Sequence, residues 1–183
     1  MNDSERLTQA VVARPGHHAR VRVWFDGSCS PNPGGTPQYG WYALDDADSV
    51  LARQSGSVER MPKAGKTNNS AEWGGLYAAL QWIEASRLQI GVLAIYGDSK
   101  LVVDQLTGRM RCKKDHLKQF RDMSLALLAK LPVGTWTIKW IPRKQNMLAD
   151  DLSKAGGVVA RPHQQMPLIV PHSQKSPPRL HPF

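Results

Sequence analysis

The stretch GVLAIYGDS (residues 91–99) decides the fold class of this chain. It contains a continuous apolar run that starts at one glycine and stops at another, as expected for a strand buried in a parallel sheet. The run leads directly to Asp98. The preceding segment 71–83 has apolar residues at helical spacing, and a shorter helix is predicted from about residue 99 to 106. This alternation of helix and strand predicts an α/β domain.

The other predicted elements extend this pattern in both directions. Strands are predicted over 21–25, 39–44, 50–57 and 135–140, and further helices over 115–131 and 144–154. The order β-β-β-α-β-α-α-β-α predicts a five-stranded mixed sheet with helices on both faces. The first strand is predicted to end in a turn at Asp26 and Gly27, and residues 68–70 are predicted to cap the first helix. The acidic segment 45–48 is predicted to be the turn of a hairpin.

The length and the composition of the ends predict one folded domain. The chain has 183 residues, enough for one core but not for two ordinary domains. We expect a flexible N-terminal extension over 1–20 and a folded domain over 21–157. The segment 158–183 is rich in proline and has no acidic residue, so a disordered tail is predicted there.

Charge and cysteine content narrow the class of partner and the compartment. Lys and Arg total 24 against 15 Asp and Glu, which gives a net charge of +9 and favours a polyanionic partner such as nucleic acid. A basic surface that binds nothing in particular is the alternative. Two cysteines, Cys29 and Cys112, form no disulfide framework; a single disulfide is the alternative to the reduced compartment that we expect. No apolar stretch is long enough to span a membrane. We therefore expect a cytoplasmic protein, and a monomer, since nothing in the sequence demands a dimer.

Four acidic residues, each in a short polar motif, predict a metal site. They are Asp26 in FDGS, Glu72 in TNNSAE, Asp98 in YGDS and Asp150 in NMLAD. Each acid alone has a structural explanation, such as capping a helix or facing its N-terminus. Carboxylates at strand ends in such sheets converge on one edge, however, and carboxylates with phosphate oxygens are the usual ligands of Mg²⁺. Together the four acids predict a magnesium site that acts on nucleic acid.

The same motifs resemble those of the type 1 ribonuclease H family in order and spacing. The resemblance rests on DGSC (26–29) with NPGG (32–35), TNN (67–69) with Glu72, DS (98–99), and Asn146 with AD (149–150), and it covers residues 21–157. It implies a ribonuclease H-like fold and an endonuclease that cuts the RNA strand of an RNA-DNA hybrid. It also implies products with 5′-phosphate and 3′-hydroxyl ends, and two Mg²⁺ ions as cofactor, with Mn²⁺ as a substitute.

The resemblance assigns roles to individual positions. It implies four metal ligands, which are Asp26, Glu72, Asp98 and Asp150. It implies that the hybrid is contacted by Cys29, Asn32, Asn68, Asn69 and Asn146, and that Thr67 lies near a DNA phosphate. Amide side chains suit this task, because they both donate and accept hydrogen bonds, as the 2′-hydroxyl of RNA does.

Two departures from the family pattern concern the residues that assist catalysis. Many members have a histidine about ten residues before the last aspartate, where this chain has Trp140 followed by IPRKQ (141–145). The stretch resembles a subgroup with a Pro-Arg-x-x-Asn pattern. Arg143 stays protonated and cannot be a general base, so we expect it to bind the scissile phosphate or the leaving group.

The second departure is a short basic loop in place of the separate basic helix of some members. The loop 108–116 concentrates lysine and arginine, and we expect Lys113 and Lys114 to contact phosphates. A solvated charged face is the alternative. Two further functions stay open at this point: a catalytically silent nucleic-acid-binding module, and another nuclease or transferase of the wider ribonuclease H superfamily.

Overall fold

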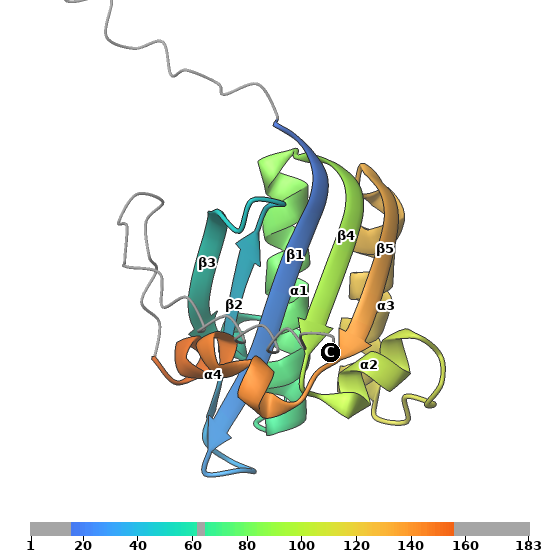
Figure 1. Cartoon of the computed structure of the whole chain (residues 1–183). Coiled ribbons are helices and arrows are strands. Elements are labelled where there is room, and N and C mark those ends of the chain that lie inside the picture. Colours follow the sequence, from blue (N-terminus) through green and yellow to red (C-terminus); the bar gives the residue numbers. More distant parts are fainter. Residues whose placement is uncertain (1–15, 62–64, 156–183) are drawn as a thin grey trace, which may run out of the picture.

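A computed structural model of the chain describes residues 16–61 and 65–155. Its five strands form one sheet in the order β3-β2-β1-β4-β5 (Figure 1). The strands are β1 (His17–Ser30), β2 (Thr36–Leu44), β3 (Val50–Ser57), β4 (Gln89–Gly97) and β5 (Val133–Trp140). The helices are α1 (Asn68–Ser86), α2 (Lys100–Leu106), α3 (Asp115–Lys130) and α4 (Met147–Lys154), with short 3₁₀ turns η2 (Val58–Arg60) and η3 (Arg143–Gln145). The predicted tail 158–183 and most of the predicted extension 1–20 lie outside the described residues.

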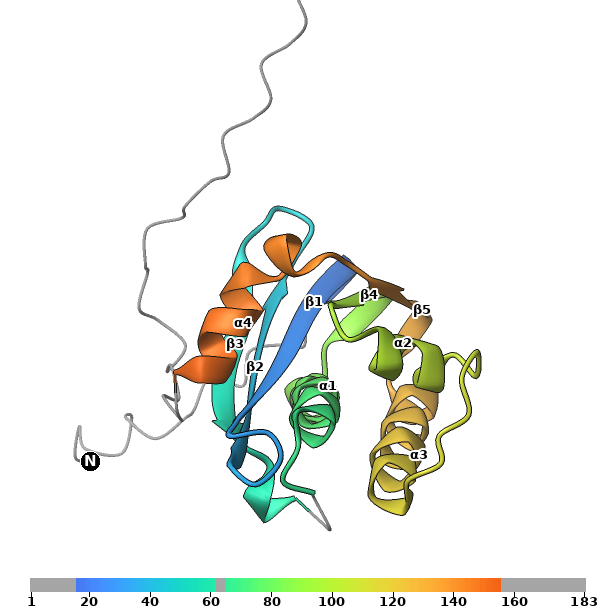
Figure 2. The ribbon, with the colours of Figure 1, turned by 90° about the horizontal axis from the view of Figure 1, so that it is seen from below.

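The sheet is mixed, as predicted. Strand β1 pairs antiparallel with β2 and parallel with β4, while β3 and β5 form the two edges. Helices α1 and α3 lie on one side of the sheet, and α4 crosses β1 and β2 on the other (Figure 2). The prediction of a five-stranded mixed sheet with helices on both faces is therefore confirmed. No helix in the described ranges is long and apolar enough to cross a membrane.

The core lies between the sheet and α1. Val23 and Phe25 of β1 and Ile95 of β4 face Leu76 and Leu80 of α1, and all five side chains are almost completely buried. Since every second residue of a strand points to the same face, this burial leaves Trp24 and Asp26 on the face that α4 partly covers. The alternation along β1 thus separates the core from the polar residues of the site.

Strand β1 is longer than predicted at both ends. It begins at His17, four residues before the predicted start. The turn predicted at Asp26 and Gly27 is wrong, because the pairing with β2 continues to Ser30. Gly27 has another purpose: a Cβ atom there would lie 2.0 Å from the backbone nitrogen of Glu72 in α1. The glycine lets helix and strand backbones approach closely.

Two other local predictions can be compared with the structure. Helix α1 is capped by Thr67, one residue before the predicted capping segment, because its Oγ1 accepts a hydrogen bond from the backbone nitrogen of Ser70 at 3.2 Å. The acidic segment 45–48 does form the hairpin turn. Asp45 Oδ1 accepts hydrogen bonds from the backbone nitrogens of Ala47 and Ser49, at 2.9 and 2.8 Å, so its charge stabilises the turn.

Candidate active site

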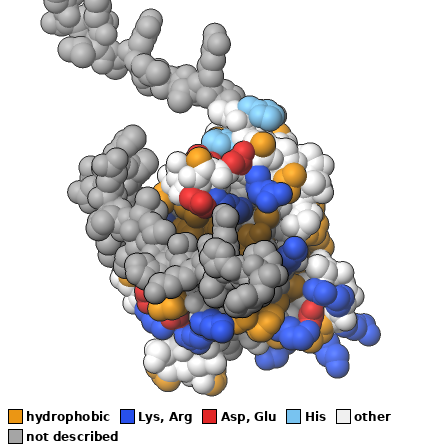
Figure 3. All heavy atoms as spheres, viewed as in Figure 1, with side chains coloured by type: hydrophobic (Ala, Val, Ile, Leu, Met, Phe, Trp, Pro, Cys, Tyr) orange, Lys and Arg blue, Asp and Glu red, His pale blue; other side chains and the backbone are white. Residues whose placement is uncertain are grey.

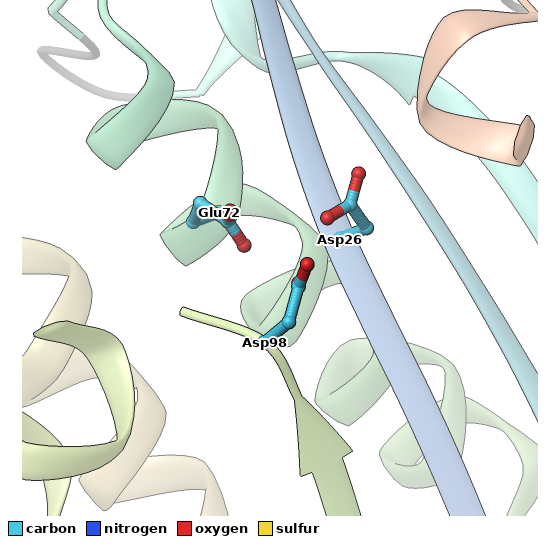
Figure 4. Close-up of side chains that lie close together, drawn as sticks. All are labelled: Asp26, Glu72 and Asp98. Atoms are coloured by element: carbon cyan, nitrogen blue, oxygen red, sulfur yellow. The ribbon is translucent and has the colours of Figure 1, made fainter. Parts of the chain in front are cut away.

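Three of the four predicted metal ligands meet at one end of the sheet. Asp26 comes from β1, Glu72 from the first turns of α1, and Asp98 from the segment just after β4 (Figure 4). Each contributes a carboxylate oxygen, and these oxygens lie within 4.8 Å of one another. Close packing of α1 on β1 makes this possible, since Gly75 as well as Gly27 leaves no room for a side chain: a Cβ at Gly75 would lie 2.7 Å from the carbonyl oxygen of Asp26. We call Asp26, Glu72 and Asp98 the carboxylate triad.

Asp150 lies outside the triad and is held by two cations. One of its carboxylate oxygens accepts a hydrogen bond from Arg143 and the other from Lys154. Its charge nevertheless contributes to raising the pKa values of both Asp26 and Glu72, so it belongs to the same electrostatic cluster. The structure thus brings three predicted ligands together and pairs the fourth with basic side chains beside them.

Two side chains from the last turn and helix position the triad. Asn146 Nδ2 donates to Asp98 Oδ1 at 3.0 Å and to the carbonyl oxygen of Phe25 at 2.9 Å. Asn146 has no exposed surface, so its predicted contact with substrate is corrected: it supports Asp98 from behind. Ser153 Oγ donates to Asp26 Oδ2 at 2.6 Å, a role that the sequence did not signal.

Negative charge dominates around the triad, and the positive charge of Arg143 opposes only part of the pKa shift at Glu72. Burial, and then the negative charges of Asp98 and Asp150, raise the pKa of Asp26 to about 7, although the hydrogen bond from Ser153 opposes the shift. Burial, followed by the charges of Asp26 and Asp98, raises the pKa of Glu72 well above its usual range. Glu72 Oε2 is shielded from solvent and accepts no hydrogen bond from any described residue. An unpaired, buried carboxylate oxygen among other carboxylates is what a divalent cation would satisfy.

The donor set fits a hard divalent cation. Mg²⁺ prefers carboxylate oxygens and keeps several waters, and Mn²⁺ accepts the same ligands. Asp26, Glu72 and Asp98 would hold such an ion. Their negative charges would attract a divalent cation more strongly than neutral ligand groups could.

The raised pKa values predict how the stability of the metal-free protein depends on pH. The usual pKa of Asp26 is 3.8, and in the folded protein its pKa is about 7, so the folded state holds more protons than the unfolded state between these values. The free energy of unfolding therefore falls as the pH rises from about 4 to about 7. In EDTA, the melting temperature is expected to be several degrees lower at pH 8 than at pH 5. Saturating Mg²⁺ or Mn²⁺ should recover most of this loss at pH 8. A melting temperature in EDTA that rises with pH would contradict the prediction.

The residues predicted to contact the hybrid lie around the loop after β1 and the start of α1. Asn32 Oδ1 accepts a hydrogen bond from the backbone nitrogen of Asn68 at 3.1 Å, which ties the loop to the helix. Both of these side chains are exposed, and Asn69 and Thr67 are half-buried beside them. Cys29 is different. Its thiol is buried and donates to the carbonyl oxygens of the following loop, so only its backbone can face a ligand.

The basic loop between α2 and α3 is partly anchored. Arg109 pairs with the buried Asp104 at 3.1 Å, and this ion pair fixes the start of the loop. Arg111, Lys113 and Lys114 are exposed. Figure 3 shows Lys and Arg side chains gathered at this end of the molecule, around α2 and the loop that follows it. These three cations are therefore available to a phosphate backbone, whereas Arg109 is engaged.

Trp140 is the last residue of β5 and contacts the backbone of Asp98. Its indole nitrogen donates to the carbonyl oxygen of Asp98 at 3.0 Å, and half of the residue is exposed. The tryptophan thus helps to hold the backbone of a triad residue and offers no group that could transfer a proton at neutral pH.

Comparisons with known sequences place the chain among ribonuclease H relatives. A family model described as "Reverse transcriptase-like" matches residues 24–156. Ribonuclease HI of Halobacterium salinarum is 32% identical over 143 residues, which are 78% of this chain and 67% of that protein. A bifunctional protein of Mycobacterium tuberculosis is 34% identical over 137 residues, or 73% of this chain. The chain spans only 34% of the length of that second relative.

Solved structures give the same result. The crystal structure of ribonuclease H1 from Halobacterium salinarum matches with a TM-score of 0.63 and 31% identity, covering 73% of this chain and 93% of that one. The N-terminal ribonuclease H domain of a Mycobacterium tuberculosis protein matches with a TM-score of 0.64 and 32% identity, over 74% and 91%. The ribonuclease H1 named LC11, solved in complex with an RNA/DNA hybrid, matches with a TM-score of 0.63 and 25% identity, over 72% and 92%. Fold, acidic motifs and relatives agree, and the chain belongs to the ribonuclease HI family of enzymes.

Proposed function

We propose that this protein is a metal-dependent endonuclease that hydrolyses the RNA strand of RNA-DNA hybrids and leaves 5′-phosphate and 3′-hydroxyl ends. The observation that carries the proposal is the carboxylate triad, three acids from β1, α1 and the end of β4 with oxygens within 4.8 Å. The complex of a related ribonuclease H1 with an RNA/DNA hybrid supports the choice of substrate.

The proposed mechanism is an in-line displacement at the scissile phosphate. Two divalent cations, when bound, supply activation of the attacking water and stabilisation of the leaving oxygen. The residues that would hold them are the triad and Asp150. Asn146 fixes the orientation of Asp98, and Ser153 does the same for Asp26. Arg143 carries a fixed positive charge at the edge of the site, where its guanidinium is suited to a phosphate oxygen.

The proposed substrate contacts combine neutral and basic groups. Asn32, Asn68 and Asn69 would meet the 2′-hydroxyls of the RNA strand, since amides donate and accept without adding charge beside the triad. The backbone at Cys29 would line the same groove, and Thr67 would approach a phosphate of the DNA strand.

Lys113 and Lys114 are proposed to bind phosphates, and their replacement should change the salt dependence of binding. Replacing both with glutamine should weaken hybrid binding and lower the slope of log affinity against log salt by about one unit per lost contact. Fluorescence anisotropy in EDTA, over a range of salt concentrations, measures this without cleavage. Lys130→Gln is the control, because Lys130 is exposed at the far end of α3. Lys113→Gln and Lys114→Gln are also measured singly, so that each removes one charge, as Lys130→Gln does. If their slopes equal that of Lys130→Gln, the loop is only a solvated charged face.

A substrate panel tests the proposed activity. Labelled RNA-DNA hybrid, RNA duplex, single-stranded RNA and DNA duplex are each incubated with Mg²⁺, Mn²⁺ or EDTA. We expect the RNA of the hybrid to be cleaved only when metal is present. Because the expected products carry a 5′-phosphate, a polynucleotide kinase should label them only after phosphatase treatment. Binding of the hybrid without cleavage in either metal would favour a silent binding module, and cleavage of DNA duplex would favour another superfamily activity.

A further inference from the structure

We propose that Arg143 is a built-in competitor of the second cation: its guanidinium occupies Asp150 until a divalent ion takes that carboxylate, and is then released toward the substrate phosphate. This role rests on the proposed metal-dependent function. Arg143 would then have two roles: it competes with the cation for Asp150, and it binds a substrate phosphate once it is displaced.

The two halves of the acidic cluster differ in the partners they have. The triad oxygens lie within 4.8 Å of one another, and Glu72 Oε2 has no hydrogen-bond donor among the described residues. Asp150 has both carboxylate oxygens engaged, one by Arg143 and one by Lys154. A divalent ion can therefore enter the triad without breaking an ion pair, whereas an ion that needs Asp150 must displace a side chain.

The geometry allows Arg143 to leave. Its side chain is 68% exposed, while that of Asp150 is only 13% exposed. It projects from the short turn η3, seven residues before Asp150, and it is not part of α4. An ion pair with one partner so exposed is weak, because water replaces the contact at little cost. Lys154, by contrast, is four residues beyond Asp150 on the same helix, so the backbone of α4 keeps the two residues on one helix face.

Release of Arg143 has a use. A guanidinium has five donors in a fixed plane, and it binds phosphate oxygens with the same geometry with which it binds carboxylate oxygens. Once Asp150 is taken by a metal ion, Arg143 has lost its carboxylate and is free to bind a phosphate on the substrate. Metal loading and phosphate binding are then coupled through one side chain.

Counting bound Mn²⁺ by electron paramagnetic resonance, without nucleic acid, tests this directly. Arg143→Gln removes the competitor and should tighten the second Mn²⁺ by about three- to fivefold. The first Mn²⁺ should tighten by less, because Arg143 contacts Asp150 directly and acts on the triad only through its charge. The control is Lys144→Gln, which removes the same charge from the adjacent position of η3, where the structure shows no contact with Asp150. It should change neither ion by more than about twofold.

A second variant and the possible outcomes keep the test decisive. Lys154→Gln frees the other oxygen of Asp150 and should also tighten the second ion, which guards against a folding defect specific to Arg143→Gln. Equal gains in Arg143→Gln and Lys144→Gln, or no gain in Arg143→Gln with the first ion bound normally, would overturn the competitor role alone. Failure of the unaltered protein to bind even one Mn²⁺ would instead overturn the proposed metal-dependent function.

Discussion

Asp26→Asn is expected to abolish hybrid hydrolysis and, at the same time, to stabilise the metal-free protein above pH 7. The amide cannot supply the charge that holds a cation between Glu72 and Asp98, so the turnover number should fall by about a thousandfold or more. The same change removes a buried negative charge whose pKa is raised to about 7 by burial and by its acidic neighbours. The asparagine still accepts the hydrogen bond of Ser153, so packing is preserved.

Opposite changes in activity and stability distinguish a functional carboxylate from a structural one. Turnover is measured with Mg²⁺ on labelled hybrid, and stability from thermal melts in EDTA at pH 8. Asp151→Asn is the control, since Asp151 is the exposed neighbour of Asp150 on α4. It should leave both quantities close to those of the unaltered protein. A metal-free Asp26→Asn protein that melts below the unaltered one would mean that the carboxylate stabilises the fold, contrary to its environment.

Gly27→Ala is expected to be among the most destabilising single-methyl changes in the domain. The added Cβ would lie 2.0 Å from the backbone nitrogen of Glu72 and 2.2 Å from the backbone carbon of Ala71. Because these are backbone atoms of α1, no side-chain rotation can relieve the overlap, and the helix must move away from β1. We expect a loss of about 3 kcal/mol in the free energy of unfolding, measured by urea denaturation. Activity should fall as well, since Glu72 moves with the helix.

Gly108→Ala is the control for Gly27→Ala, because at Gly108 the backbone conformation favours glycine but no neighbouring atom obstructs a methyl group. Gly108 has a positive φ of 75° and open space where a Cβ would stand. Its replacement should cost only about 1 kcal/mol, the usual penalty of a left-handed residue. If Gly27→Ala proved no more costly than Gly108→Ala, the tight contact between β1 and α1 would not be what sets the position of Glu72.

The acidic residues of the site could be predicted from the sequence much better than the ion pairs and hydrogen bonds that they form. Asp26, Glu72 and Asp98 are recognisable because each stands in a short polar motif next to a segment with a clear strand or helix pattern. The ion pair between Arg143 and Asp150 is not, since no local pattern encodes how the turn η3 is placed against α4. The spacing of Asp150 and Lys154, four residues apart on α4, is by contrast a signal that the sequence does contain. Asn146 was predicted at the substrate, because its motif indicates importance but not whether the side chain faces the ligand or the protein.

Gly27 shows why a correct motif can carry a wrong structural explanation. An aspartate followed by a glycine after a β-branched run is a usual turn signal. The strand instead continues to Ser30, and the glycine is required by a helix that lies more than forty residues further along the chain. A contact between backbones leaves no trace in hydrophobic periodicity, so only the three-dimensional structure distinguishes the two reasons for a glycine.

The alternation along β1 links the correctness of folding to catalysis. A slip of β1 by one residue against its neighbours would turn Asp26 into the apolar layer beneath α1 and would expose Phe25, because successive side chains point to opposite faces. A sheet with this one-residue slip would therefore lose both the packing of Phe25 in the core and the position of Asp26 beside Glu72 and Asp98. Asp26, the proposed metal ligand, therefore also disfavours this wrong strand register, because the slip would bury its carboxylate among apolar side chains.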